Sequence, residues 1–117
     1  MKKGNKASNL IKTELYLGKG VPGGFEVTEQ QFAEFIKKII TKYFPQGITV
    51  YEAYGQMQEP DKTITKQATW VVEIVRAKTA ENDKKIKLIV DDYRKEFQSP
   101  QAMWTDSAVK ARFYTHE

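Results

Sequence analysis

The sequence predicts one α+β domain in which two amphipathic helices alternate with four strands. Three observations support this prediction. Two apolar stripes have helical spacing, four other segments alternate in polarity or are rich in β-branched residues, and glycine or proline separates the segments. A chain of 117 residues suits a single domain, and 40% hydrophobic residues is not a disordered composition.

The first predicted strand covers residues 11–17. Leu15 and Leu17 share one face, while Glu14 and Tyr16 share the other. Four glycines and a proline between residues 18 and 24 then predict a loop. Because no Gly-Lys-Ser/Thr follows these glycines, we interpret the loop as a tight turn rather than a phosphate-binding loop.

The first predicted helix begins after Thr28, which forms a capping-box pattern with Gln31. Its apolar stripe consists of Phe32, Phe35, Ile36, Ile39, Ile40 and Tyr43. Pro45 disfavours helical geometry at Phe44, so the helix is expected to end there.

A strand over residues 48–58, a turn over 59–62 and a second strand over 64–76 are predicted next. The second of these strands is apolar on both faces between residues 70 and 75, except at Glu73, as is typical of a central strand. In the first, Tyr51 and Tyr54 fall on opposite faces, and the sequence does not decide which of them faces away from the helices.

The second predicted helix follows the N-cap residue Thr79 and ends at Ser99-Pro100. Residues 102–114 form the last predicted strand, with three residues expected to face inward: Val109, Ala111 and Phe113. The segment 104–107 is interpreted as a bulge or a bend rather than regular strand.

This order of elements predicts a ferredoxin-like βαββαβ fold, with strand order 4-1-3-2. Right-handed connections would place both helices on one side of the four-stranded antiparallel sheet and leave its other side uncovered. Three connections, 18–27, 56–64 and 98–105, would then meet at one end of the domain. A small ligand often binds at such a rim.

The candidate ligand-binding residues are those expected on the uncovered face or at this rim: Glu14, Tyr16, Tyr54, Gln56, Glu73, Trp104 and Arg112. Glu14, Glu73 and Arg112 are expected on neighbouring strands, where they would bind a polar or cationic ligand. A cross-strand ion pair is the simpler interpretation of these three residues, and we prefer it. Trp104 suits either a stacking platform or the edge of the core.

Composition excludes several classes of site. The chain has no cysteine and one histidine, His116, so we assign no catalytic residue, metal or cofactor. Four of the 19 basic residues, Lys2, Lys3, Lys6 and Lys12, precede the first acidic residue, and the remaining 15 balance the 15 acidic residues. Residues 14–117 are therefore neutral, and we expect a flexible basic tail over residues 1–10, a single domain over 11–115, and no nucleic-acid partner.

Three segments resemble a bacterial family of uncharacterised proteins: Thr13-Glu-Leu-Tyr-Leu-Gly18, Ala53-Tyr-Gly-Gln56 and Tyr93-Arg-Lys-Glu-Phe-Gln98-Ser99. With Phe44-Pro-Gln-Gly-Ile-Thr-Val50, the similarity to domain of unknown function 3574 spans residues 12–113. It implies a compact α+β domain and no particular activity. Met57 stands where the family often has tryptophan.

The sequence favours a binding domain that forms a homodimer through the uncovered sheet face and takes a small polar or aromatic ligand. One alternative is a cofactor-free enzyme with Glu14 or Glu52 as base and Tyr16 or Tyr54 as proton donor. Another is single-stranded nucleic-acid binding through the sheet, which the neutral domain disfavours. No membrane span or secretion signal is recognisable, so we expect a cytoplasmic protein.

Overall fold

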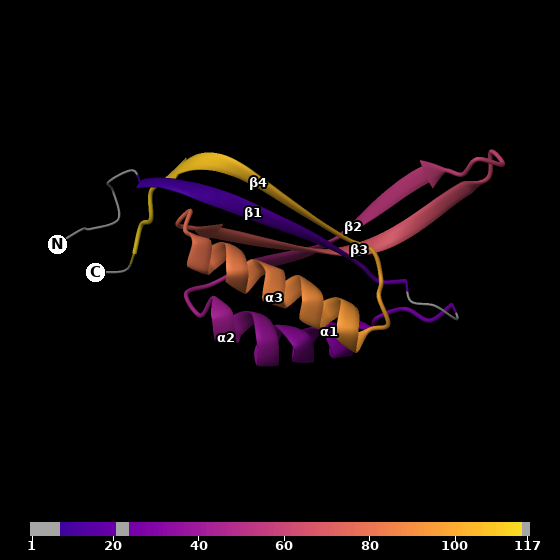
Figure 1. Ribbon diagram of the computed structural model, residues 1–117, viewed down its shortest axis with the longest axis horizontal. Coiled ribbons are helices and arrows are strands. Elements are labelled where there is room, and N and C mark those ends of the chain that lie inside the picture. The colour runs from indigo at the N-terminus through magenta and orange to yellow at the C-terminus, as the bar shows by residue number, and fades with distance from the viewer. Residues whose placement is uncertain (1–7, 21–23, 116–117) are drawn as a thin grey trace.

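The computed structural model describes residues 8–20 and 24–115, which form a sheet layer and a helix layer (Figure 1). The strands are β1 (Ser8–Gly18), β2 (Thr49–Gln58), β3 (Ile64–Arg76) and β4 (Ala102–Ala111). The helical segments are α1 (Glu29–Phe35), which continues through a π-helical turn (Ile36–Ile40) into α2 (Thr41–Tyr43), and α3 (Ala80–Glu96). The predicted α+β class, with one four-stranded antiparallel sheet and two helical segments, is confirmed.

β1 and β3 are the central strands, because the order across the sheet is β2-β3-β1-β4. Counted from the β4 edge, this order is 4-1-3-2. Each strand pairs with its neighbours without a skipped residue. Directly opposed residues point to the same side of a sheet, so the register assigns every strand side chain either to the helix-covered face or to the face without helices, called here the open face.

The core lies between the helices and the covered face of the sheet. Its residues include Leu15, Leu17, Trp70, Val72 and Ile74 from the sheet and Phe32, Phe35, Ile86, Ile89 and Tyr93 from the helices. The rings of Phe32 and Trp70 are stacked, with 4.6 Å between their centroids. Each fully buried side chain of this size contributes roughly 1.5–3 kcal/mol to folding. This packing holds both helices against one side of the sheet.

Both ends of the sheet differ from the sequence prediction. β1 begins at Ser8, so residues 8–10 belong to the sheet rather than to the expected tail. Residues 1–7 and His116 lie outside the described part of the chain. β4 ends at Ala111, although the sequence predicted a strand to residue 114.

The predicted faces of β4 were wrong. The register is regular through residues 104–107, without a bulge, and places Val109 opposite Leu10 on the open face. Ala111 shares that face, whereas Trp104 and Asp106 point toward the helices. Alternation in β4 is weak, and a shift of one residue moves every side chain to the other face.

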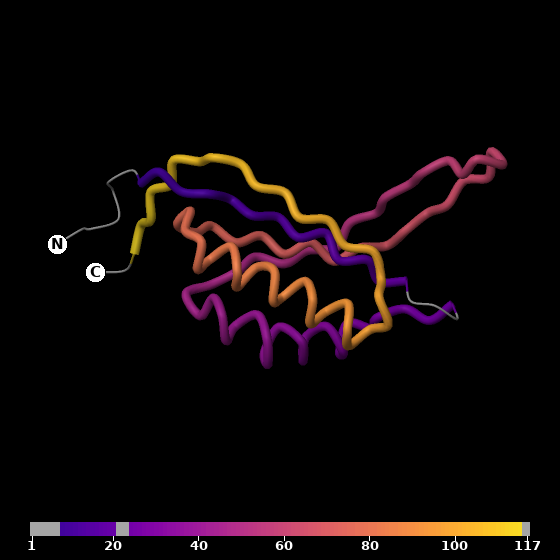
Figure 2. The backbone as a smooth tube through the Cα atoms, viewed as in Figure 1, coloured from indigo at the N-terminus to yellow at the C-terminus, as the bar shows by residue number. Residues whose placement is uncertain are grey.

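β2 and β3 extend past the rest of the sheet as a two-stranded arm, defined here as residues 54–66 (Figure 2). β1 ends at Gly18, which lies opposite Thr69, so the strand residues of the arm pair only within the β2–β3 hairpin. Figure 1 shows the arm bending away from the helices, toward the side of the open face.

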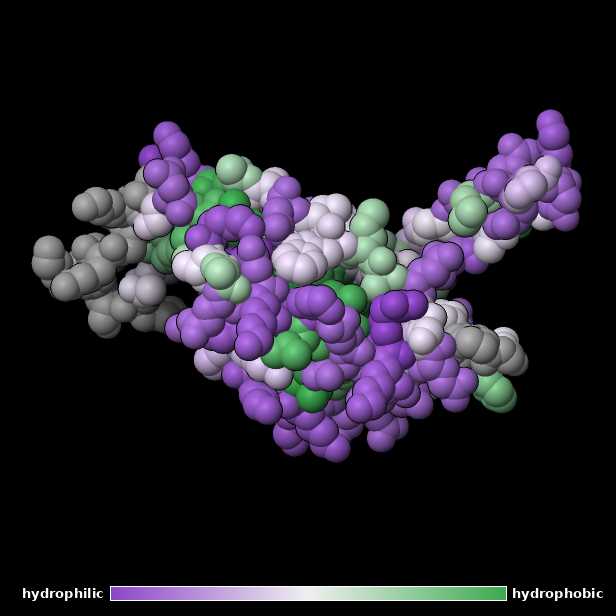
Figure 3. All heavy atoms as spheres, in the orientation of Figure 1, coloured by the Kyte–Doolittle hydropathy of each residue, from purple (hydrophilic) through white to green (hydrophobic). Residues whose placement is uncertain are grey.

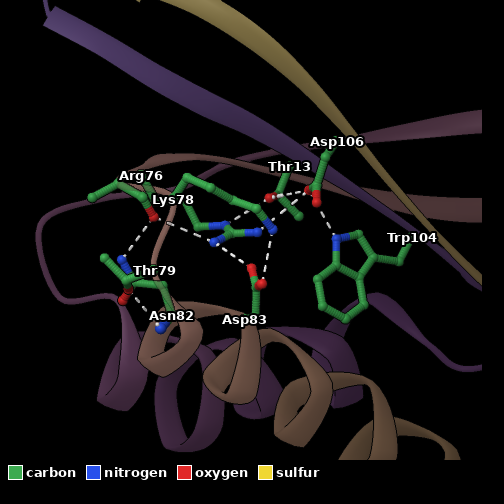
Figure 4. A network of polar contacts seen from close by, with 9 residues as sticks. Thr13, Arg76, Lys78, Thr79, Asn82, Asp83, Trp104 and Asp106 are labelled. Atoms are coloured by element: carbon green, nitrogen blue, oxygen red, sulfur yellow. Dashed lines mark hydrogen bonds and ion pairs between the residues drawn. The ribbon is translucent and has the colours of Figure 1, made fainter.

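A buried arginine joins the two layers at the opposite end of the sheet (Figure 4). The side chain of Arg76 is 2% exposed and forms ion pairs with Asp83 of α3 at 2.9 Å and Asp106 of β4 at 3.4 Å. Its Nε also donates to the hydroxyl of Thr13 at 2.8 Å. Because these partners come from three elements, the network fixes how α3 lies on the sheet.

Candidate functional site

Two rows of side chains cross the middle of the open face. One row runs from β4 to β2 through Met103, Tyr16, Val71 and Tyr51. The next row runs through Thr105, Glu14, Glu73 and Thr49. Although no helix covers it, Val71 is fully buried, because its neighbours in the row are two tyrosines. The open face is therefore partly apolar at its centre.

Two carboxylates lie directly opposite each other in the second row. Glu14 of β1 pairs with Glu73 of β3, and the hydroxyl of Tyr51 donates to Glu14 Oε2 at 3.3 Å. Within residues 8–20 and 24–115, no basic side chain forms an ion pair with either glutamate. Partial desolvation and the charge of Glu14 raise the pKa of Tyr51, so this phenol stays protonated and serves as a donor at neutral pH.

A hollow of about 340 Å³ lies beside these rows, toward the root of the arm. It forms because four small residues are neighbours across the strands: Gly18, Thr69, Ala53 and Gly55. Larger side chains surround them, namely Tyr16, Gln67, Gln101 and Met103. The hollow thus combines an aromatic ring, a thioether and two amides on one side of the sheet.

Gly18 forms a fixed part of the hollow. Its N–H donates to the carbonyl of Gln101 at 2.8 Å, and its carbonyl accepts from the buried hydroxyl of Tyr93 at 2.7 Å. A Cβ atom at Gly18 would lie 3.1 Å from the carbonyl oxygen of Gln101 and 3.2 Å from Nε2 of Gln67. A larger residue would therefore displace one of the two amide groups that line the hollow.

Three of the predicted residues lie together. Glu14, Tyr16 and Glu73 occupy adjacent positions on the open face. Tyr54 borders the hollow, but its position along β2 assigns its side chain to the other face, where it is 84% exposed. Tyr51 takes the place on the open face, and the register continues undisturbed through Gly55.

The other predicted residues lie elsewhere. Arg112 follows the end of β4, seven residues beyond Thr105, the partner of Glu14, so roughly 23 Å of strand separates it from the carboxylates. Trp104 packs against the core and donates to Asp106 at 2.9 Å. Gln56 lies on the arm and does not line the hollow. The expected grouping of Arg112 with the two glutamates was wrong, because the register places Thr105 beside Glu14 and leaves Arg112 beyond the end of β4.

Sequence reasoning left Tyr51, Gln67 and Met103 out of the candidate set. Each follows its strand's alternation, but a single strand does not show which face the helices cover. The small residues of the hollow are far apart in the sequence and become neighbours only through the register. No local motif could have identified them.

A wider hollow, about 650 Å³, lies at the other end of the sheet. It opens where β3 continues past Thr49, the first residue of β2, and its lining includes Phe44, Arg76 and Lys85. Arg76 is fully engaged by Thr13, Asp83 and Asp106. We therefore give more weight to the smaller hollow, whose two side-chain amides form no hydrogen bond with another described residue.

The described residues contain no metal-binding cluster of acidic side chains and no helix that could span a membrane. No three of their aspartate and glutamate side chains gather in a group that would hold a metal ion. None of their helices is both long and apolar enough to cross a membrane.

The fold is similar to two structures of a phage SAM lyase. The structure in complex with S-methyl-5'-thioadenosine has a TM-score of 0.60 at 11% identity, over 89% of this chain and 90% of the lyase chain. The apo structure has a TM-score of 0.61 at 10% identity, over 93% and 94%. No curated protein matches the sequence. Residues 12–113 match the family described as "Protein of unknown function (DUF3574)", and the chain belongs to this family.

Proposed function

We propose that this protein binds a small ligand with an aromatic ring and polar groups in the hollow beside Tyr16. The observation that carries this proposal is the hollow itself, which combines Tyr16 and Met103 with the amides of Gln67 and Gln101 on a face without helices. Its volume of about 340 Å³ lies within the range of small-molecule sites, roughly 300–1,000 Å³.

The chemistry of the lining favours a nucleoside-like ligand. A planar base stacks on a tyrosine ring, and primary amides supply both hydrogen-bond donors and acceptors for its edge. Met103 offers a polarizable surface to an apolar or sulfur-containing group. The similarity in fold to a lyase whose structure is in complex with S-methyl-5'-thioadenosine supports this nucleoside as the first probe.

Titration with S-methyl-5'-thioadenosine, followed by amide NMR shifts, tests the proposal. We expect saturable shifts in Tyr16, Gln67 and Met103, because these residues line the hollow. Gly18→Ala should weaken binding about tenfold, since the new methyl group displaces a lining amide. Lys85→Ala is the matched control, because Lys85 lines the other hollow.

Two results would contradict this assignment. One is the absence of saturable shifts with the thionucleoside, adenosine and SAM. The other is binding that Lys85→Ala abolishes while Gly18→Ala leaves it unchanged, which would move the site to the wider hollow.

A second candidate function is acid–base catalysis, favoured by the hydrogen bond from Tyr51 to Glu14. Of the bases considered from the sequence, Glu52 is already paired with Lys19, so Glu14 is the better base. Tyr51 replaces Tyr16 and Tyr54 as the proton donor. The test is loss of SAM in the presence of the protein, measured by mass spectrometry. Glu14→Gln should abolish any turnover.

The fold type, the pairing of copies and the location of the chain also belong to this proposal. The order of elements and the strand order 4-1-3-2 support a ferredoxin-like domain. Copies would pair through the open face, in the cytoplasm. The acidic pair Glu14 and Glu73 at the centre of that face disfavours single-stranded nucleic acid as a partner.

A further inference from the structure

The arm, residues 54–66, is unusually exposed for a segment of regular strand. Its apolar side chains include Tyr54, Met57 and Ile64, which are 84%, 50% and 52% exposed. Figure 3 shows the arm standing clear of the rest of the chain. A two-stranded hairpin is at best marginally stable alone in water, so the arm gains stability if another surface covers it.

The tip of the arm is nevertheless well defined. Asp61 accepts hydrogen bonds from the backbone and hydroxyl of Thr63, at 3.0 and 2.6 Å. The hydroxyl of Thr65 donates to Glu59, at 3.2 Å. These bonds satisfy both acidic side chains of the arm within the hairpin. The turn therefore keeps the strands in register and presents their side chains in fixed positions.

The arm is neutral overall, because two lysines balance Glu59 and Asp61, but only the acidic pair has side-chain partners within the hairpin. Lys62 at the tip and Lys66 on the strand are exposed, and neither forms an ion pair with another described residue. The open face has the complementary feature, because Glu14 and Glu73 lie opposite each other without a basic partner in the described chain. Opposed carboxylates repel each other, and cations from another copy would relieve that repulsion.

The lengths of arm and face also match. Ile64 lies five residues beyond Thr69, so the strand part of the arm reaches roughly 17 Å past the sheet. From Thr69 to Glu73 along the open face is four residues, roughly 14 Å. An arm laid along this face would therefore bring its lysines level with the carboxylates. Its bend toward the open side gives it room to do so (Figure 1).

We propose that the arm of one copy lies across the open face of a second copy, with Lys62 and Lys66 beside that copy's Glu14 and Glu73. Tyr54 and Ile64 share the side of the arm that carries Lys66, and they pack over Tyr51 and Met103. The arm then closes the exposed side of the hollow, so each ligand site is completed by another copy. This inference rests on the proposed pairing through the open face and identifies the segment that makes it.

The inference is tested on the full chain by measuring molar mass with light scattering. The wild-type protein is compared with variants in which the charge of one residue is reversed. The wild-type protein should have a multiple of the 13.5 kDa chain mass at high concentration. Lys66→Glu and Glu73→Lys should each weaken assembly about tenfold, and the double exchange should restore it. Lys37→Glu, an exposed change on the helical side, is the matched control and should leave the mass unchanged.

Three outcomes separate the claims. Restoration by the double exchange supports the contact, because a folding defect in the single variants would not be repaired by a second charge change. A wild-type protein that stays monomeric overturns both the arm contact and pairing through the open face. Assembly that is unaffected by every exchange overturns the arm contact alone and leaves pairing in place.

Discussion

Asp106 shows how much of this structure depends on single polar residues. Its Oδ1 accepts hydrogen bonds from Thr13 at 2.7 Å and Trp104 at 2.9 Å, and it is paired with Arg76 at 3.4 Å. Arg76 is almost completely buried. A buried guanidinium without its carboxylate partner is costly, because water no longer solvates its charge.

Asp106→Ala is therefore expected to lower the free energy of unfolding by about 3 kcal/mol, since it leaves the charge of Arg76 only partly compensated. Asp106→Asn should cost less, because the amide oxygen still accepts from Thr13 and Trp104. Urea unfolding followed by tryptophan fluorescence measures both values. Equal stability of Asp106→Ala and wild type would show that the network contributes nothing.

The carboxylate of Asp106 also makes the free energy of unfolding depend on pH. Burial raises the pKa of Asp106, but hydrogen bonds from Thr13 and Trp104 and the charge of Arg76 outweigh it, so the net pKa is lowered. Its contribution is present above the ordinary aspartate range, near 4, and is lost as the pH falls through the lower folded value. Unfolding of Asp106→Asn should accordingly depend less on pH below about 4.

The Tyr51 hydroxyl provides a local probe of the open face. Partial desolvation raises its pKa, and the charge of Glu14 and the hydrogen bond to it raise it further. Glu14→Gln should bring the pKa back toward 10, because the repulsion between phenolate and carboxylate is lost. NMR titration of ring-labelled tyrosine measures this shift. An unchanged pKa would mean that the two groups are not in contact in solution.

Helix starts are the elements that local sequence describes best. Thr28 accepts from the backbone of Gln31 at 3.1 Å, and the side chain of Gln31 accepts from the backbone of Thr28 at 2.9 Å, as the capping box predicted. The hydroxyl of Thr79 caps α3 by accepting from the backbone N–H of Asn82 at 3.0 Å. These bonds join residues three positions apart, so no distant partner is needed.

Thr28→Ala should lower the free energy of unfolding by about 1 kcal/mol, because the backbone N–H of Gln31 loses the hydroxyl that accepts from it. Thr41→Ala is the control, since Thr41 is exposed inside the helical segment and alanine is the stronger helix former. Thermal unfolding of both variants gives the comparison. A loss of stability as large in Thr41→Ala would contradict the capping explanation.

At the scale of the whole molecule, the central strands should be the most protected from exchange. β1 and β3 each pair with two strands, and the helices cover one of their faces. The strands of the arm pair only with each other. Amide hydrogen exchange of dilute protein should be slowest at Leu15 and Val72 and at least about a hundredfold faster at Gln56 and Lys66. Equally slow exchange throughout would indicate that the arm is covered even at low concentration.

The sequence alone determined the number, order and approximate bounds of the elements, because capping, apolar periodicity and proline act within a few residues. It also placed Glu14, Tyr16 and Glu73 on strands expected to be neighbours, and the register then brings them together. The tertiary structure alone decided the orientation of β4, the choice of Tyr51 over Tyr54, and the hollow around Gly18. Those features depend on register between strands that are distant in the sequence, and register is set by packing of the whole sheet against the helices.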